Sequence, residues 1–366
     1  METTLLILGA LALAYFNGAN DNFKGVATLF GSQTTDYKKA IRWATLCTFA
    51  GSLAAIFLAK TLVKNFSGKG LVPDGTAQLP EFVLAVLAGA IFALLIATLI
   101  GMPISTTHSL VGGLVGGGMA MAPGQVNFSV LGAGFLLPLL FSPVAAIMLG
   151  YVVYKACHFA RLKAGLTSET CVCIGERWEV MPGKHHTATA SSLVSLDIAD
   201  EQVCRQRYAG QFWGLNAQGI VDTLHFLSAG WLSFARGLND TPKIAGVLLL
   251  TTAFGLPVNL LAVGMTIALG GMLSARKVGI TVGKKVTPMN AGQGLSANVS
   301  AASLVTLASL LGLPVSTTHV SVGAIFGIGM QTNDANKKMI RNIALAWLLT
   351  LPLAALGSAV VAILFG

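Results

Sequence analysis

The sequence predicts an all-α polytopic membrane protein with two inverted-topology repeats, in which broken helices and paired hairpins meet near the membrane midplane. Three observations carry this prediction. The chain is strongly apolar, an eight-residue motif occurs twice, and corresponding loops in the two halves differ in positive charge. The first observation indicates the class of protein, the second indicates the repeat and the third indicates its inversion.

Composition is typical of a membrane protein. Of the 366 residues, 54% are hydrophobic and 10% are charged, and the mean hydropathy is +0.74. A soluble domain carries about a quarter charged residues. Residues 82–154 contain no Asp, Glu, Lys or Arg, and a single span needs only about 20 apolar residues. The net charge of +9 comes from short basic clusters between apolar runs. Basic residues placed in this way set the orientation of membrane spans and do not indicate a nucleic acid partner.

The duplicated motif reads Gly-x-Pro-x-Ser-Thr-Thr-His at residues 101–108 and 312–319, an offset of 211 (312 minus 101). Gly-x-Pro stops a helix, and the hydroxyl row that follows can cap a new one. Each copy lies between apolar stretches, so each is predicted to break a membrane helix and restart it. A restarted helix offers free backbone N–H groups and the positive end of its dipole, which together suit an anion.

The first repeat is assigned to residues 1–154. Its opening apolar segment is interpreted as the first span, since no basic region or cleavage site marks it as a cleaved signal. A polar stretch with Gly-Ala-Asn-Asp interrupts this segment at residues 17–25, where a carboxylate at membrane depth needs a polar interior. The other expected elements are a span at 43–63, a polar loop at 64–81, hairpin arms at 82–100 and 104–122, and a span at 128–154.

The second repeat is assigned to residues 208–366. Its Gly-Leu-Asn-Asp at 237–240 matches Gly-Ala-Asn-Asp at 18–21 with an offset of 219 (240 minus 21), and Lys24 and Lys243 keep that offset. Matched interruptions in two halves indicate internal structural repeats. The elements expected after this unit are apolar runs at 244–253 and 257–275, hairpin arms at 288–311 and 315–330, and a final span at 342–365.

Residues 155–207 differ sharply from the rest and are expected to form a cytoplasmic connecting loop. Seven basic and six acidic residues fall in this segment. The five cysteines of the chain are odd in number, which argues against a disulfide framework. Cys171 and Cys173 lack the second pair of a zinc site and are interpreted as ordinary loop cysteines. His185 and His186 are interpreted as loop polarity.

Loop charge predicts that the repeats are inverted. Three basic residues follow the first Asn-Asp unit at 38–42, whereas the corresponding loop at 253–258 has none. The loop after the first hydroxyl motif, 123–127, is uncharged, whereas 331–341 has three basic residues. By the positive-inside rule, corresponding loops lie on opposite sides, with both termini outside the cell. The exceptions fall on the outer side: Lys60, Lys64 and Lys69.

The two hydroxyl motifs supply a candidate anion site. Two helix N-termini and six hydroxyl donors would surround the anion, with asparagine amides beside it. The alternative is that the hydroxyls only cap helices or bond to their own backbone. The predicted substrate ligands are Ser105, Thr106, Thr107, Ser316, Thr317, Thr318, Asn20 and Asn239.

The same units carry oxygen donors that suit a hard cation such as sodium. Alternatives for the carboxylates are a proton relay and structural ion pairs with Lys24, Lys243 or Arg236. The two lysines are therefore secondary site candidates. His108 and His319 are also secondary candidates, as a proton site or as hydrogen-bonded packing groups. The predicted sodium ligands are Asp21, Asp240, Asn17, Asn20 and Asn239.

With these paired motifs the chain resembles the inorganic phosphate transporter family, which includes bacterial low-affinity phosphate symporters and sodium-coupled animal phosphate transporters. The resemblance covers both halves. It implies inorganic phosphate as substrate, uptake coupled to sodium or protons, and a scaffold domain around a transport core. Two local departures bear on the coupling ion: Leu238 replaces the alanine of the first copy, and Asn22-Phe23-Lys24 follows the first aspartate.

With this resemblance, we expect a secondary active symporter that imports phosphate with sodium ions by alternating access around a midplane site. The alternative is a proton-coupled phosphate or sulfate symporter. An anion channel is disfavoured because anion pores use rings of Arg or Lys. The sequence shows no nucleophile and base at a recognisable spacing, so it does not indicate an enzyme. The expected setting is the lipid bilayer of the plasma membrane, crossed several times, with a homodimer as a further expectation.

Overall fold

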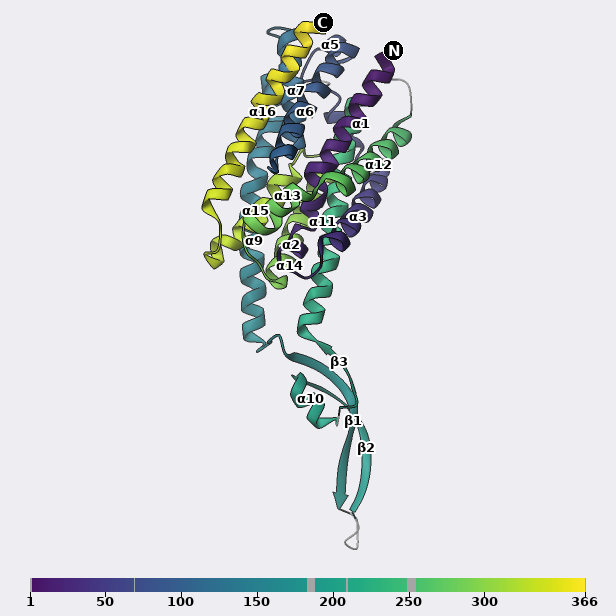
Figure 1. Cartoon of the computed structure of the whole chain (residues 1–366), viewed down its shortest axis with the longest axis vertical. Helices are drawn as coiled ribbons and strands as arrows, with labels where there is room; N and C mark the ends of the chain where they lie inside the picture. The colour runs from purple at the N-terminus through teal and green to yellow at the C-terminus, as the bar shows by residue number, and fades with distance from the viewer. Residues whose placement is uncertain (1, 69, 183–187, 209, 249–254, 366) are drawn as a thin grey trace. The chain divides into compact units, whose positions relative to one another are not determined.

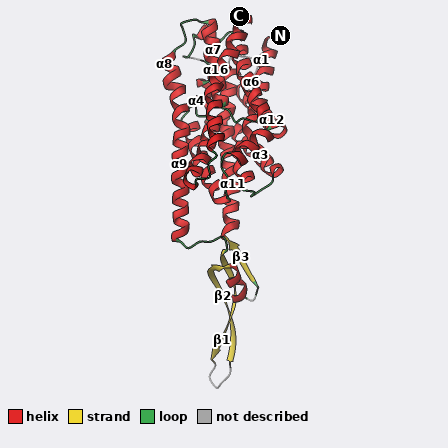
Figure 2. Ribbon diagram, turned by 60° about the vertical axis from the view of Figure 1, so that its left-hand side comes forward, coloured by secondary structure: helices red, strands yellow, loops and turns green. Residues whose placement is uncertain are grey.

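The computed structural model describes residues 2–68, 70–182, 188–208, 210–248 and 255–365, excluding the side chains of 177–193. The chain forms two compact units, one of Met1–Tyr154 with Phe226–Gly366 and one of Lys155–His225. Figures 1 and 2 show the first unit as a bundle of helices, and the second contains strands and a short helix. Lys69, His185 and His186 lie outside the described residues.

Long apolar helices build the helical unit. Six segments of the described chain are long and apolar enough to cross a membrane. In the first half, the predicted hairpin arms correspond to α6 and α7. The elements of this half are α1 (Glu2–Asp21), the 3-10 turn η1 (Asn22–Gly25), α2 (Ala27–Gly31), α3 (Tyr37–Leu58), α4 (Lys60–Asn65), α5 (Asp74–Ala77), α6 (Pro80–Ile100), α7 (Thr106–Met121), α8 (Phe128–Val130), the π-helical turn η2 (Leu131–Leu136) and α9 (Leu137–Lys163).

The second half follows the same plan around its own hydroxyl motif. The predicted arms correspond to α14 and α15, and the predicted final span lies within α16. The elements of this half are α11 (Ala217–Leu248), α12 (Leu256–Ser274), α13 (Arg276–Ile280), the π-helical turn η3 (Thr281–Lys285), α14 (Ala291–Leu310), α15 (Thr317–Thr332) and α16 (Lys337–Phe365).

The expected interruptions at the Asn-Asp units are largely wrong. Helix α1 continues through Asp21 and tightens only at η1. Helix α11 runs unbroken past Asp240, although Pro242 lies inside it. An interior proline costs about 3 kcal/mol or more, yet side-chain contacts one helical turn apart, such as Arg236 with Asp240, require helical spacing here. These buried contacts favour the helix over the local break.

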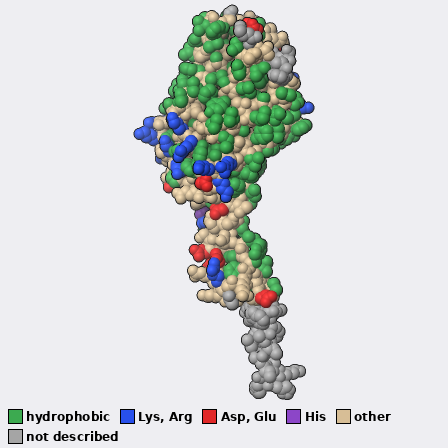
Figure 3. Space-filling view, turned by 45° about the vertical axis from the view of Figure 1, so that its right-hand side comes forward, with side chains coloured by type: hydrophobic (Ala, Val, Ile, Leu, Met, Phe, Trp, Pro, Cys, Tyr) green, Lys and Arg blue, Asp and Glu red, His purple; other side chains and the backbone are tan. Residues whose placement is uncertain are grey.

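Packing in the helical unit joins segments that are distant in sequence. Helix α16 packs along α7 and α6, α1 contacts both α12 and α6, and α12 also contacts α3. Figure 3 shows hydrophobic side chains over most of the visible face of this unit, with Lys and Arg side chains gathered toward one end. An apolar belt with a basic end is typical of a membrane protein. The inverted relation of the repeats and their orientation stay predictions.

The second unit corrects the expectation of a purely α-helical chain with a connecting loop at 155–207. It holds a three-stranded antiparallel sheet in the order β2-β1-β3. Val194, Leu196 and Ile198 alternate with polar residues, which is the period of a strand. The unit extends beyond residue 207 because β3 pairs with β1. Its elements are β1 (Thr170–Pro182), β2 (Ala188–Asp200), α10 (Glu201–Arg207) and β3 (Phe212–Asn216).

A small core under α10 overturns the expectation that the chain forms no disulfide. Cys171 and Cys173 of β1, Cys204 of α10 and Tyr208 are buried together. Cys173 and Cys204 are joined by a disulfide, while Cys171 is a free thiol. The sequence did not indicate this pairing because 31 residues separate the two cysteines and only the folded strand and helix bring them together.

Helix α6 ends at Gly101 in a left-handed conformation with φ of +73°. A side chain at such a position costs about 1–2 kcal/mol. We therefore expect Gly101→Ala to lower the thermal unfolding midpoint of the detergent-purified protein. Gly132→Ala is the control, because Gly132 has no positive φ and open space around it. Equal midpoints for the two variants would contradict this account of the helix end.

Candidate functional site

The two hydroxyl motifs each begin a helix, as their residue types predict. Ser105 caps α7 by accepting a hydrogen bond from the backbone N–H of His108 at 3.1 Å. Ser316 caps α15 by accepting from the N–H of His319 at 3.2 Å. Serine is among the preferred capping residues because its oxygen satisfies a free N–H in the first turn. Both helices therefore start inside the protein with their positive dipole ends at the motifs.

The starts of α7 and α15 contact each other directly. The Thr107 hydroxyl donates to the carbonyl oxygen of Val315 at 3.3 Å. The Thr318 hydroxyl donates to the carbonyl oxygen of Ile104 at 2.7 Å. Ile104 and Val315 are separated by 211 residues, as are Thr107 and Thr318, so the two contacts are equivalent in the two halves. Each motif thus holds the other through a hydroxyl and a backbone carbonyl.

The Lys24 ammonium group lies within a set of oxygen atoms from both halves. Lys24 is on η1 and its side chain is buried. Its Nζ contacts the carbonyl oxygen of Ile104 at 3.0 Å and the hydroxyl of Thr318 at 2.6 Å. The set is completed by Asn20 Oδ1 at 2.9 Å and by an ion pair with Asp21.

Lys243 of α11 repeats this arrangement with the halves exchanged. Its Nζ contacts the carbonyl oxygen of Val315 at 2.7 Å and the hydroxyl of Thr107 at 2.9 Å. It also donates to Asn239 and lies 3.3 Å from Asp240 Oδ1. Every partner matches a partner of Lys24 at the offset of 211 or 219. Each lysine therefore connects the Asn-Asp unit of its own half to the threonine of the other.

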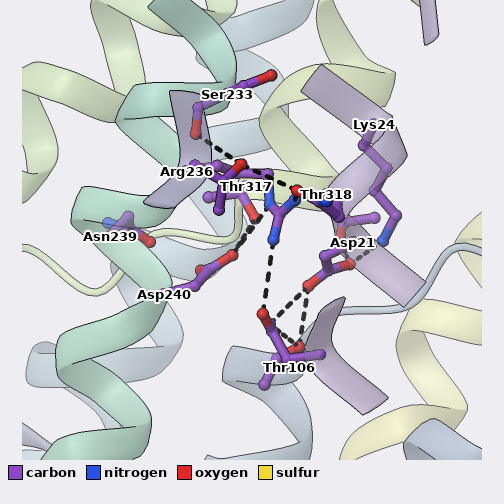
Figure 4. A network of polar contacts seen from close by, with 12 residues as sticks. Asp21, Lys24, Thr106, Ser233, Arg236, Asn239, Asp240, Thr317 and Thr318 are labelled. Carbon is purple, nitrogen blue, oxygen red and sulfur yellow. Dashed lines mark hydrogen bonds and ion pairs between the residues drawn. The ribbon is translucent and has the colours of Figure 1, made fainter. Parts of the chain in front are cut away.

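The two aspartates are also held by hydroxyls, as Figure 4 shows from close by. Asp21 Oδ2 accepts from Thr106 at 2.9 Å and from the Asn17 amide at 3.1 Å. Asp240 Oδ2 accepts from Thr317 at 3.1 Å and from Arg236 Nε at 3.3 Å. The predicted ion pairs of these carboxylates with lysine and arginine are thus present, and the carboxylates are within reach of the predicted hydroxyls.

The charges in this site favour an anion. Asp21, Lys24, Arg236, Asp240 and Lys243 are the buried Asp, Glu, Lys and Arg side chains of the part of the chain that the structure describes. Three cations and two carboxylates give a formal net charge of +1. A positive charge that is shielded from water acts strongly on a nearby anion, because the effective dielectric constant is low. The six predicted hydroxyl residues are each at most 3% exposed, so the site is closed to solvent.

Sequence reasoning identified Arg236 only as an ion-pair partner and missed two supporting residues. Arg236 lies 219 residues after Asn17, so in the second repeat it occupies the position that corresponds to Asn17 in the first. Thr98 accepts a hydrogen bond from the Asn20 amide at 3.2 Å. Ser309, at an offset of 211 from Thr98, accepts from the amide of the second asparagine, Asn239, at 2.8 Å. Applying the two offsets to every polar residue would have found all three.

The two motif histidines lie against each other beside the site. The ring centroids of His108 and His319 are 4.6 Å apart, and the His319 ring is 3.9 Å from that of Trp347. The Trp347 indole in turn donates to the carbonyl oxygen of Pro103, within the first motif. These ring contacts support a packing role, and a role in proton transfer stays a prediction.

Comparison with known proteins identifies the family of this chain. The model of the phosphate transporter family matches residues 17–358, which include both hydroxyl motifs and both Asn-Asp units. The chain belongs to the phosphate transporter family. A protein of Pyrococcus abyssi named as a phosphate permease is 30% identical, with 97% of this chain and 96% of that protein covered. A chloroplastic inorganic phosphate transporter of Arabidopsis thaliana is 27% identical, with 97% and 71% covered.

The fold is shared with a solved structure. A sodium-dependent phosphate transporter matches with a TM-score of 0.75 at 24% identity, covering 99% of this chain and 98% of its own. The predicted family, transporter fold and absence of enzymatic function are confirmed by these comparisons, since the relatives are transporters and permeases of phosphate. Family membership and several apolar helices make the protein a multi-pass membrane protein.

Arg236 provides a direct test of the charge arrangement. Removing one partner of a buried ion pair is destabilising, and without Arg236 the Asp240 carboxylate would keep Lys243 as its charged partner. Arg236→Leu is therefore expected to lower the thermal unfolding midpoint by several degrees in detergent. The matched control is Arg42→Leu, because Arg42 is exposed at the surface of the same unit. A midpoint equal to that of the control would argue against a structural pair between Arg236 and Asp240.

Proposed function

We propose that this protein imports inorganic phosphate by secondary active transport, with alternating access around the buried site. The observation that carries the proposal is the meeting of two helix N-termini with six hydroxyl residues under a net positive charge. Helix N-termini bind phosphate through free N–H groups and the dipole. Family membership supports phosphate over sulfate. The proposal also includes location in the plasma membrane, a homodimer and a cytoplasmic position for residues 155–207, which lie in the second unit.

Phosphate binding competes with the contacts between the two motifs. The Thr107 and Thr318 hydroxyls now donate to carbonyl oxygens of the opposite motif. An anion at this point would take these donors and release the carbonyls. Because the site is closed to solvent, the two halves must also separate on one side and then on the other to exchange the ion. In this proposal, substrate binding and the movement of the halves therefore both break the contacts between the two motifs.

Sodium is the coupling ion that the sequence favoured, and the name of the solved sodium-dependent relative supports it. A different arrangement is supported by the contacts of Lys24 and Lys243. Each ammonium group has a carboxylate, an amide oxygen, a hydroxyl and a carbonyl around it, which are the oxygen donors that a hard cation uses. We propose that the lysines act as tethered cations, so that phosphate binding needs no sodium at Asp21 or Asp240. A proton gradient is then the coupling candidate.

The double variant Thr107→Ala with Thr318→Ala tests the phosphate site. Each lost hydrogen bond to an anion is worth about 1.5–3 kcal/mol, so the affinity for radiolabelled phosphate should fall at least tenfold. The control is Thr266→Ala with Thr350→Ala, because in the described part of the chain these hydroxyls bond to carbonyls of their own helices. Unchanged phosphate affinity in the folded double variant would rule out the hydroxyl site. Sulfate that competes as well as phosphate would point to a sulfate symporter.

The coupling ion is tested with phosphate uptake into proteoliposomes under separate sodium and proton gradients. The unmodified protein is expected to bind phosphate equally in sodium and in choline buffers. Lys24→Met should make phosphate binding depend on sodium, since the freed oxygen set suits that ion. Lys277→Met is the control, because this lysine is exposed and in the described structure its ammonium group donates to the carbonyl oxygen of Leu99. Strong sodium dependence of the unmodified protein would reject the tethered cations and favour sodium coupling.

A further inference from the structure

A buried group of three cysteine sulfurs lies in the unit of Lys155–His225, outside the phosphate site. Cys171 and Cys173 are on β1 and Cys204 is on α10, and each is at most 2% exposed. All three Sγ atoms lie within 4.8 Å of one another. Cys173 and Cys204 form a disulfide, and the Cys171 thiol lies beside it. A disulfide needs two cysteines, so the third sulfur requires its own explanation.

The fold brings the sulfurs together by simple rules. Residues two apart in a strand point to the same face, so Cys171 and Cys173 share one face of β1. Helix α10 packs against all three strands and supplies the third sulfur, Cys204. Gly214 of β3, which pairs with Cys173, leaves room for the Cys171 sulfur, since a Cβ there would lie 2.8 Å from that atom. The group is therefore a product of register, helix packing and one glycine.

The group has two oxidation states. In the oxidised state Cys173 and Cys204 are joined and the Cys171 thiol lies beside the disulfide. Reduction of the disulfide gives three thiols in the same small core.

We propose that the reduced form of Cys171, Cys173 and Cys204 binds one Zn²⁺ ion through three thiolates. A dithiol reductant delivers two electrons and two protons to the disulfide, giving two thiols and the oxidised reductant. Zn²⁺ then displaces the three thiol protons and forms three metal–sulfur bonds. Such bonds are about 2.3 Å long, so the sulfurs would be about 4 Å apart around the ion. The three Sγ atoms already lie within 4.8 Å of one another, and reduction frees Cys173 and Cys204 to separate to that distance. Soft thiolates favour zinc over hard cations.

The loop charges connect this site to a compartment. In the orientation predicted from them, the unit of Lys155–His225 faces the cytoplasm, where thiols are kept reduced. The metal-binding form is then the prevailing one, and oxidation to the Cys173–Cys204 disulfide removes two of three ligands. The site is thus redox-dependent and independent of phosphate chemistry.

Cd²⁺ titration of the full-length protein in detergent tests the proposal, because cadmium replaces zinc at thiolate sites and gives a thiolate-to-metal absorption band. After reduction with a phosphine and removal of the phosphine, one equivalent of Cd²⁺ per chain should bind. The oxidised protein should show no band. Cys171→Ser should weaken binding at least tenfold, whereas Cys47→Ser with Cys157→Ser, which removes the other two cysteines, should bind as the unmodified protein does.

Binding that survives in Cys171→Ser, or that is equal in oxidised and reduced protein, would overturn the proposal. The reduced protein must also remain folded to present three sulfurs, and far-UV circular dichroism with size-exclusion chromatography checks this. Loss of the sheet on reduction would count against the site. The Cys204→Ser variant cannot form the disulfide. Without any reductant it should therefore bind Cd²⁺ more weakly than the reduced unmodified protein does. Zn²⁺ itself, measured by competition with a chromogenic chelator, should give the same ranking of variants.

Discussion

The structure depends on two helix N-termini that face each other inside the protein. Two positive dipole ends and their free N–H groups would be costly together in a low-dielectric interior. Serine caps satisfy one N–H in each helix, and each motif accepts hydroxyl donors from the other at Ile104 and Val315. The Asp21 and Asp240 carboxylates add negative charge near the positive ends of the two helix dipoles, which lowers this cost. The repeat of the motif, with its helix-ending glycine, supplies both sides of this arrangement.

Lys24 and Lys243 make the arrangement a joint between the two halves. Each pairs with the aspartate of its own half and contacts a threonine of the other, Thr318 or Thr107. In the proposed alternating-access mechanism, an ammonium group between the halves cannot keep all of these partners when the halves separate. A bound anion adjacent to the lysines would then take the place of the oxygen atoms that move away. That mechanism links substrate binding and movement through the same few oxygen and nitrogen atoms.

Most of the helical unit was predictable because long apolar runs indicate helices and the two Gly-x-Pro-x-Ser-Thr-Thr-His motifs indicate where helices end and begin. Both are signals from residues close together in the sequence. The contact partners within the site follow the offsets of 211 and 219, so they too were accessible. The sequence could not reveal that α11 stays helical through Pro242, because the buried Arg236 and Asp240 contacts that favour the helix are tertiary. The sheet of the second unit was missed because a polar, charged composition was interpreted as a loop, although Val194, Leu196 and Ile198 alternate. The disulfide depends on folding at long range.

The two halves are not equivalent at the point where Asn17 corresponds to Arg236. Asp240 pairs with Arg236 as well as with Lys243, whereas Lys24 is the cation paired with Asp21 in the described structure. If Lys24 moved away, the donors left to Asp21 in the described structure would all be neutral: Asn17, Thr106 and Thr318. Asp240 would keep a guanidinium group after loss of its lysine. The carboxylate of the first half therefore has one charged partner in the described structure, whereas the carboxylate of the second half has two.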